Sequence, residues 1–228
     1  GAGRALMSSM PDRDIVRLLM RINAEAKTEA AIVALPDLMD SIREIREISY
    51  EILSGLEAAH QAGIVHRDLK PANVMLTHRG AIVMDFGVAG FDTLPATPPD
   101  PAEAHSLVRT EAGTIFGSPA YMAPELWEGA SATIQSDLYS FGVMLYELAT
   151  GCYPIRGHDL PSLIAAHLHG QPVPFDVSDP EGRLPENLRV LLLATMAKDP
   201  ADRPASAEEF SARLAEIGAA WPAPSSAQ

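Results

Sequence analysis

Cysteine is nearly absent from the 228-residue sequence, which contains one residue of this type, Cys152. A single cysteine cannot form a disulfide within the chain, and this is typical of proteins that stay in a reducing compartment. No apolar run reaches the roughly 18 residues that a membrane-spanning helix needs, and no signal peptide opens the chain. We therefore expect a cytoplasmic location, and a longer form of the protein could still be membrane-anchored with this part in the cytoplasm.

Positive charge is also scarce. Seventeen Lys and Arg residues stand against thirty Asp and Glu residues, which gives a formal net charge of −13 and an isoelectric point near 4.9. A surface with this excess of negative charge repels phosphate backbones, so it argues against broad nucleic-acid binding. With 47% hydrophobic and 21% charged residues, the composition is otherwise that of an ordinary globular protein.

The spacing of apolar residues predicts a mainly α fold with one small β-hairpin. Within residues 40–62 they recur every three to four positions, as in an amphipathic helix, and Gly63 is a typical helix end. Two short β-like runs at 74–76 and 81–84 flank a polar turn, which predicts a hairpin. Further helices are predicted at residues 136–150, 159–169, 186–197 and 206–217.

The most informative stretch is His66-Arg67-Asp68-Leu69-Lys70-Pro71-Ala72-Asn73, between the long helix and the hairpin. Asp85-Phe86-Gly87 follows the second predicted strand, and Ala123-Pro124-Glu125 precedes the helix at 136–150. In this order they resemble the signature H-R-D-L-x-x-x-N, D-F-G and A-P-E of eukaryotic-type protein kinases. The sequence resembles serine/threonine kinases of bacterial type, and the resemblance covers roughly residues 37–217, which correspond to the C-terminal lobe of a fold that is α+β in full-length kinases.

The resemblance implies a role for each polar residue of the first two motifs. Asp68 would accept or orient the proton of the attacking hydroxyl, and Lys70 would lie near the transferred phosphate. Asn73 and Asp85 would hold Mg²⁺, a cation that prefers oxygen ligands, beside ATP. Phosphoryl transfer depends mainly on positioning and charge neutralisation. The implied activity is transfer of the ATP γ-phosphate to Ser or Thr hydroxyls of protein substrates.

Regulatory residues are also implied by the resemblance. Arg67 would pair with a phosphate on the activation segment, residues 85–125. Thr110 and Thr114 are the hydroxyls best placed to receive that phosphate, with Thr114 preferred, although a role as plain turn threonines is equally open. Ser118 lies in the implied substrate-docking loop, at the position where serine/threonine kinases usually have threonine.

Three further residues are implied to be structural. Asp137 would bond the backbone of the turn formed by residues 66–68, and Arg203 would pair with Glu125.

His167 and His169 could suggest a metal site, but residues two apart on a helix point to different faces. An amphipathic or solvated helix edge is therefore the favoured interpretation of these histidines.

The N-terminal lobe of a kinase is not represented in the pattern. Only 36 residues precede the long helix, which is too few for five strands of the usual length and a helix. Neither a G-x-G-x-x-G loop nor a strand lysine is recognisable, since the other lysines are Lys27, in a helix-like segment, and Lys198. We therefore expect a fragment that is nearly inactive alone, and its missing N-terminal lobe would be a required partner.

The expected organisation has three parts. Residues 1–36 are interpreted as a possible hinge remnant with an unplaced helical segment, 37–218 as the kinase-like C-terminal lobe, and 219–228 as a tail or linker. The main alternative function is a non-catalytic, kinase-like interaction module, a pseudokinase. The intact Asp68, Asn73 and Asp85 argue against it. A small-molecule phosphotransferase of related fold is disfavoured, because such enzymes generally lack the A-P-E loop.

Overall fold

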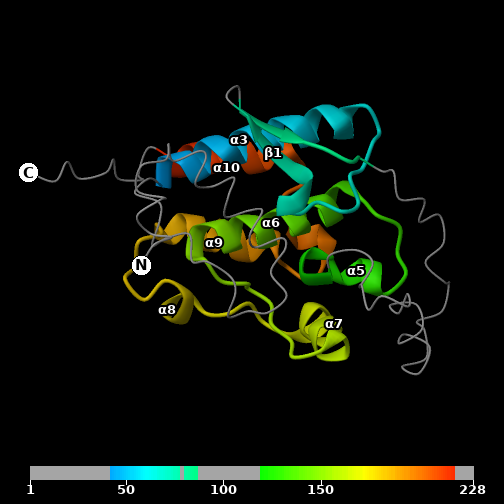
Figure 1. Cartoon of the computed structure of the whole chain (residues 1–228), viewed down its shortest axis with the longest axis vertical. Helices are drawn as coiled ribbons and strands as arrows, with labels where there is room; N and C mark the ends of the chain where they lie inside the picture. The colour runs from blue at the N-terminus through cyan, green and yellow to red at the C-terminus, as the bar shows by residue number, and fades with distance from the viewer. Residues whose placement is uncertain (1–41, 78–79, 87–118, 219–228) are drawn as a thin grey trace, which may run out of the picture.

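The computed structural model describes residues 42–77, 80–86 and 119–218 (Figure 1). Within them the chain is mainly helical with one two-stranded antiparallel sheet, which confirms the predicted composition of elements. The predicted segments 1–36 and 219–228, and Thr110, Thr114 and Ser118, lie outside the described residues.

In chain order the elements are α3 (Ile42–Gln61), η3 (Pro71–Asn73), β1 (Val74–Thr77), β2 (Gly80–Val83), η4 (Pro119–Tyr121), α5 (Pro124–Trp127), α6 (Ile134–Thr150), α7 (Leu160–His169), α8 (Phe175–Ser178), α9 (Glu186–Thr195), η5 (Pro200–Asp202) and α10 (Ala207–Gly218).

Helix α6 forms the centre of the described structure, because every residue from Ser136 to Thr150 is buried. A helix that is apolar on nearly all sides must be surrounded by other elements. Helices α3 and α9 contact it directly, α10 runs beside α3, and the hairpin packs on α3 (Figure 1). Helices α5 and α7 contact each other near the η4 turn. This arrangement brings the loop between α3 and β1 close to the first turn of α6.

The long N-terminal helix was predicted correctly, and its apolar stripe faces the core. Ile48, Ile52 and Leu56 are each at most 1% exposed. The helix ends before Gly63, whose φ of 75° is a left-handed conformation that glycine adopts without strain. Helix α6 begins at Ile134, two residues before its predicted start.

The early start of α6 is explained by a reciprocal cap. The Thr133 hydroxyl accepts a hydrogen bond from the Ser136 amide, at 3.3 Å, and the Ser136 hydroxyl accepts one from the Thr133 amide, at 2.9 Å. This is a capping box in which serine replaces the more usual Glu or Gln, so the sequence pattern was less conspicuous.

The hairpin is anchored on α3 by a carboxylate. Its register pairs Val74 with Val83 and Thr77 with Gly80, so the turn is shorter than the predicted residues 77–80. Glu51 on α3 accepts a hydrogen bond from the Ala81 amide at 2.6 Å. Gly80 has a φ of 131°, and a Cβ atom there would lie 2.6 Å from a Glu51 carboxylate oxygen. The close contact between strand and helix therefore requires glycine.

The remaining predicted helices are present with small shifts. Helices α7, α9 and α10 match the predictions, except that α9 ends two residues earlier than expected. The single-turn helices α5 and α8 were not predicted. The Ser206 hydroxyl caps α10 by accepting from the Glu209 amide, while the Glu209 carboxylate reaches the amide of Ala205 instead of Ser206. No helix in the described part of the chain is long and apolar enough to cross a membrane.

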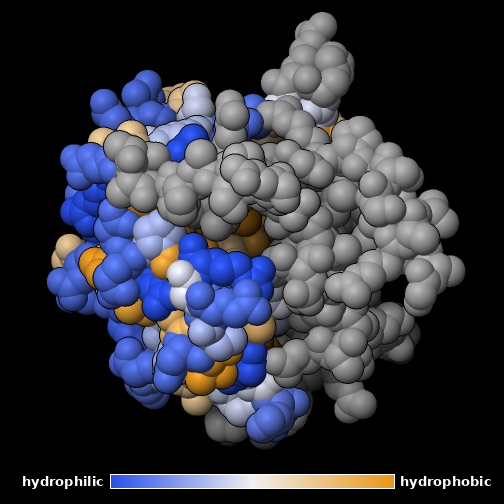
Figure 2. Space-filling model, turned by 90° about the vertical axis from the view of Figure 1, so that its left-hand side faces the viewer, coloured by the Kyte–Doolittle hydropathy of each residue, from blue (hydrophilic) through white to orange (hydrophobic). Residues whose placement is uncertain are grey.

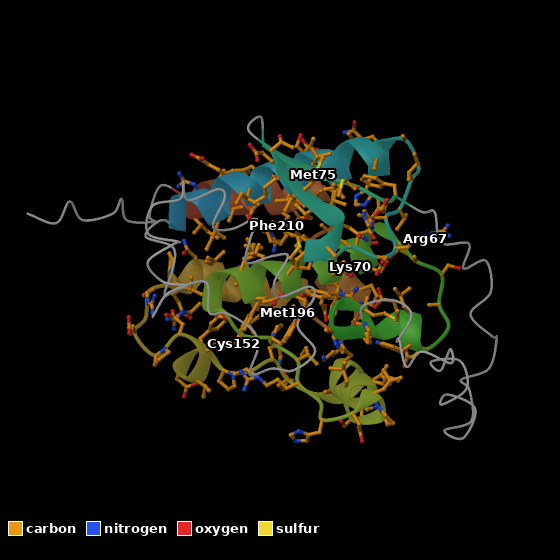
Figure 3. All side chains as sticks on the ribbon, in the orientation of Figure 1. Arg67, Lys70, Met75, Cys152, Met196 and Phe210 are labelled. Atoms are coloured by element: carbon orange, nitrogen blue, oxygen red, sulfur yellow. The ribbon has the colours of Figure 1, made fainter. Side chains whose placement is uncertain are left out.

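The described part of the face in Figure 2 mixes hydrophilic residues with smaller hydrophobic areas. Such a surface is usual for a folded domain, because scattered apolar residues remain exposed on most proteins. The large apolar side chains of the described residues are mostly in one core cluster that joins α3, α6, α9 and α10. Phe141 on α6 and Phe210 on α10 meet edge to face in this core, with ring centroids 5.1 Å apart. Phe210 is labelled in Figure 3.

Two helical glycines test the packing of this core. A Cβ atom on Gly142 of α6 would lie 2.8 Å from Cγ2 of the buried Thr195, whereas one on Gly55 of α3 would make an ordinary contact of 3.6 Å with Val83. Gly142→Ala should lower the free energy of unfolding by about 1–3 kcal/mol. Gly55→Ala should raise it by about 0.5–1 kcal/mol, because alanine favours helix. Urea unfolding measures both, and a Gly142→Ala variant that is as stable as the wild type, or more stable, would contradict the close packing of α6 on α9.

Candidate active site

The loop between α3 and β1 is held in place by the carboxylate of Asp137, in the first turn of α6. Its Oδ2 atom accepts hydrogen bonds from the His66 amide at 2.7 Å and from His60 Nε2 at 2.9 Å. Its Oδ1 atom accepts one from the Arg67 amide at 2.8 Å. Asp137 is only 1% exposed, and hydrogen bonds to a buried carboxylate are stronger than neutral ones. The contact expected between Asp137 and this turn is therefore present.

These bonds hold a strained backbone conformation. Arg67 has a φ of 73°, which costs a non-glycine residue of order 1–3 kcal/mol and persists where the surroundings enforce it. The two adjacent amides bound by Asp137 enforce it here. Figure 3 shows Arg67 and Lys70 on this loop. The Arg67 side chain is exposed, so the turn presents a cation to solvent beside the site.

Asp68 follows this turn and contacts two other predicted site residues. Lys70 Nζ donates to Asp68 Oδ2 at 2.5 Å. Asn73 Nδ2 donates to the Asp68 carbonyl at 2.8 Å and contacts Oδ2 at 3.4 Å. The Asp68 side chain stays 40% exposed. Both side-chain contacts go to Oδ2, so Oδ1 is the carboxylate oxygen left to accept a proton from an incoming hydroxyl group.

His66 connects this loop to the segment that contains Asp85. Its Nδ1 accepts from the Asp68 amide at 3.3 Å, and its Nε2 lies 2.8 Å from the Met84 carbonyl. Since a carbonyl only accepts, Nε2 carries the proton, which gives one consistent neutral tautomer. The ring of His66 also contacts that of Phe86, with centroids 4.8 Å apart.

Asp85 therefore lies between two residues that are tied to the Asp68 loop. The Met84 amide donates to the Asn73 carbonyl at 2.8 Å, and Phe86 packs on His66. Asp85 itself is exposed and has a φ of 60°, a second strained position of the kind that concentrates at functional sites. The structure thus brings Asp68, Asn73 and the backbone of Asp85 into one region.

The oxygen atoms of this region suit a hard divalent cation. Asn73 uses its Nδ2 group on Asp68, which leaves Oδ1 as a ligand, and Asp85 adds an exposed carboxylate. In the described part of the chain, no three His, Cys, Asp or Glu side chains are grouped to hold a metal ion. Mg²⁺ commonly binds through one or two protein oxygens, with the other ligands from phosphates and water. The donor set fits that mode.

Glu125 and Arg203 form a buried bidentate ion pair, as expected. Their two N–O distances are 2.8 and 2.7 Å. Arg203 also donates to the carbonyls of Ala197, Gln135 and Lys198, and it lies 4.9 Å above the Tyr139 ring. The pair fixes α5, and with it the end of the predicted activation segment, to α6 and η5.

Sequence reasoning missed a second polar group around the η4 turn. The Tyr121 hydroxyl donates to Glu147 Oε2 on α6 at 2.6 Å and contacts the Tyr153 hydroxyl at 3.4 Å. Glu147 is 2% exposed, and its Oε1 has no partner among the described residues. Burial raises the pKa of Glu147 to about 7, although the hydrogen bond from Tyr121 lowers it in part. A glutamate within an otherwise apolar helix was the signal that could have identified it.

Two more residues were missed or misjudged. His60 on α3 reaches Asp137, and its Nδ1 is buried without a partner among the described residues. His167 was expected at a solvated or amphipathic helix edge, but it is completely buried and its Nδ1 lies 2.8 Å from the Tyr139 hydroxyl. Its neighbour His169 is exposed. The two histidines do point to different faces, but the face of His167 is the core.

Comparisons with known proteins agree with the motifs. The family profile described as "Protein kinase domain" matches residues 6–213. The chain is similar to the serine/threonine-protein kinase pkn3 of Myxococcus xanthus, with 39% identity over 77% of this chain and 31% of that protein. It is 34% identical to the probable serine/threonine-protein kinase PknB of Corynebacterium glutamicum, over 76% of this chain and 26% of that protein.

The probable serine/threonine-protein kinase PknB of Lactococcus lactis is similar as well, with 37% identity over 75% of this chain and 25% of that protein. The chain thus spans less than a third of the length of each of these relatives.

The buried Glu147 predicts an unusual pH dependence of stability. Its pKa rises from 4.5 to about 7 on folding, so the folded state binds the proton more tightly than the unfolded state. Stability should therefore fall as the pH rises from about 4.5 through 7, by about 3 kcal/mol in total. Glu147→Gln should remove this fall and be the more stable form at pH 8.

The exposed Glu128 on the adjacent segment offers a matched control, and Glu128→Gln should keep the wild-type profile. Thermal unfolding between pH 5 and 8 measures all three proteins. A Glu147→Gln profile that runs parallel to the wild type would contradict the assignment.

Proposed function

The chain belongs to the protein kinase family, and on that premise we propose that it is the C-terminal, catalytic lobe of a serine/threonine protein kinase. In the full-length protein it transfers the γ-phosphate of ATP to Ser or Thr hydroxyls of protein substrates. The observation that carries the proposal is the junction of two loops through His66, which bonds both the Asp68 amide and the Met84 carbonyl. This junction gathers the residues that phosphoryl transfer needs.

Asp68 is proposed to orient the attacking hydroxyl and accept its proton. Its partly exposed carboxylate can be reached by a substrate hydroxyl, and the contacts of its Oδ2 atom with Lys70 and Asn73 restrict its rotation. Lys70 is proposed to neutralise charge on the transferred phosphoryl group. Its contact with Asp68 places a cation beside the base. Since this reaction involves little covalent chemistry by the protein, fixed positions and charges supply most of the catalysis.

Asn73 and Asp85 are the proposed Mg²⁺ ligands, and their donor atoms fit the ion. When bound with ATP, the ion neutralises phosphate charge and helps to orient the nucleotide. Asn73 also donates to the Asp68 carbonyl. The cation ligand and the base are thus parts of one hydrogen-bonded loop, which keeps their spacing constant.

We propose that an N-terminal lobe covers the nucleotide. Kinases hold the ATP phosphates with a glycine-rich loop and a lysine on a strand. Lys70 is bonded to Asp68, and Lys198 donates to the carbonyls of Ala166 and His167 at the end of α7. Neither of these two lysines is placed to act as the strand lysine, so the proposal gives that role to a residue of the N-terminal lobe.

Regulation by phosphorylation is proposed at the activation segment, residues 85–125. The exposed Arg67 cation beside the site supports it, because a phosphate on Thr114 or Thr110 would find a charge-assisted partner there. Ser118 is proposed to act in substrate docking, just before the η4 turn. The fixed position of that turn, through Tyr121 and Glu147, supports a docking role for this region.

Asp68→Asn tests the proposed base in the full-length protein that carries this chain. The substitution keeps the size of the side chain but removes a proton acceptor. Mg²⁺-dependent transfer of labelled phosphate to a protein substrate should fall by about 10²–10⁴-fold in kcat. Asp176, an exposed residue on α8, provides the same chemical change away from the site. Asp176→Asn should retain full activity, and equal activities of the two variants would refute the role of Asp68.

A further inference from the structure

The most unusual buried side chain outside the proposed catalytic residues is His167 on α7. It has no exposed surface, and an imidazole with this degree of burial needs partners for both ring nitrogens. Nδ1 has one, the Tyr139 hydroxyl at 2.8 Å. Nε2 makes no hydrogen bond of normal geometry with the described residues. One polar atom of the ring is therefore buried without a hydrogen-bond partner among the described residues.

The candidate partner for Nε2 is the backbone carbonyl of Ala120 in the η4 turn. The Ala120 carbonyl interacts with the imidazole and favours a proton on it. Helix α7 contacts η4, so the turn and the ring are neighbours. Because Nδ1 is taken by Tyr139, the nitrogen that faces this carbonyl is Nε2.

The charges around His167 keep the ring neutral. Burial, and next the Lys198 cation, lower the pKa of His167 to about 4. Lys198 lies behind the ring, with its Nζ on the His167 carbonyl at 2.8 Å. The Tyr139 ring contacts both the His167 ring and the Arg203 guanidinium group. Arg203 is itself paired with Glu125. Desolvation raises the pKa of Tyr139, so its hydroxyl keeps the proton that it can donate to Nδ1.

We propose that His167 is a positioning residue that holds the η4 turn, accepting a hydrogen bond from the Tyr139 hydroxyl at Nδ1 and donating from Nε2 to the Ala120 carbonyl. This rests on the proposed function, in which the turn borders the docking site for the substrate polypeptide. The turn is then held by α7 on one side and by α6 on the other. On the α6 side, the Tyr121 hydroxyl donates to Glu147, and the Tyr121 carbonyl accepts a hydrogen bond from the Ser140 hydroxyl at 2.7 Å. His167 thus couples α7 to the docking region without touching the substrate.

The first test measures the tautomer and needs no kinase activity. Long-range ¹H–¹⁵N NMR of this chain should show Nδ1 of His167 without a proton, Nε2 with one, and no titration between pH 5 and 8. The exposed His169 on the same helix gives the reference signal for an accessible imidazole. The opposite tautomer, or a titration midpoint above pH 6, would overturn the proposal.

The second test measures substrate use by the full-length protein. His167→Phe keeps a ring but has neither nitrogen, and it should raise the KM for the protein substrate about tenfold, the effect of one hydrogen bond. The kcat and the KM for ATP should not change. His167→Gln, which keeps a donor near the position of Nε2, should restore most of the loss, and His169→Phe should have no effect.

The outcomes separate this proposal from the proposed function. If His167→Phe has the wild-type KM, or if His167→Gln is no better than His167→Phe, the positioning role is wrong. If His167→Phe does not fold, two other results decide: the KM of His167→Gln relative to that of the wild type, and the tautomer of His167 measured by NMR. If the wild-type protein transfers no phosphate, the proposed function fails, and the tautomer measurement still judges the contact with Ala120.

Discussion

The arrangement of the site depends on one buried carboxylate. Asp137 accepts hydrogen bonds from the amides of His66 and Arg67 and from the ring of His60. It lies in the first turn of α6, a helix that is buried from Ser136 to Thr150. Because this helix has no freedom to shift within the core, the loop bound to it is held as well. The strained Arg67 backbone persists for this reason, and it directs the chain so that Asp68 follows at the surface.

From this anchor a chain of contacts leads to each part of the proposed chemistry. His66 ties the Asp68 amide to the Met84 carbonyl, and Asn73 ties the Asp68 carbonyl to the Met84 amide. The proposed base and the segments that carry the proposed ion ligands are thus parts of one network. A second set of contacts extends from α6 to the other end of the site. There Glu147 bonds Tyr121, and Arg203, which stacks on Tyr139, bonds Glu125. These contacts hold the region of Ala120 to Glu125, where a protein substrate is proposed to dock.

The sequence predicted the elements and the motif residues well, but not the buried polar network. Local spacing was sufficient for α3, the hairpin and α10, because their apolar patterns are clear. The contacts of Asp137 and the Glu125–Arg203 pair were anticipated only through resemblance to a family, since 78 residues separate the members of that pair. Glu147 and His167 were missed or misjudged because their burial depends on how α6, α7 and η4 pack together. No local pattern reports a tertiary contact of that kind.

The central claim is that two loops converge on one site for a divalent ion. Paramagnetic Mn²⁺, added to this chain as a stand-in for Mg²⁺, tests it directly through broadening of amide NMR signals. The account predicts that the amides of residues 68–70, 72–73 and 84–86 broaden together at the lowest Mn²⁺ concentrations, and that Asp85→Asn weakens both effects in parallel. Broadening of only one of the two loops, or broadening that does not change in Asp85→Asn, would contradict it.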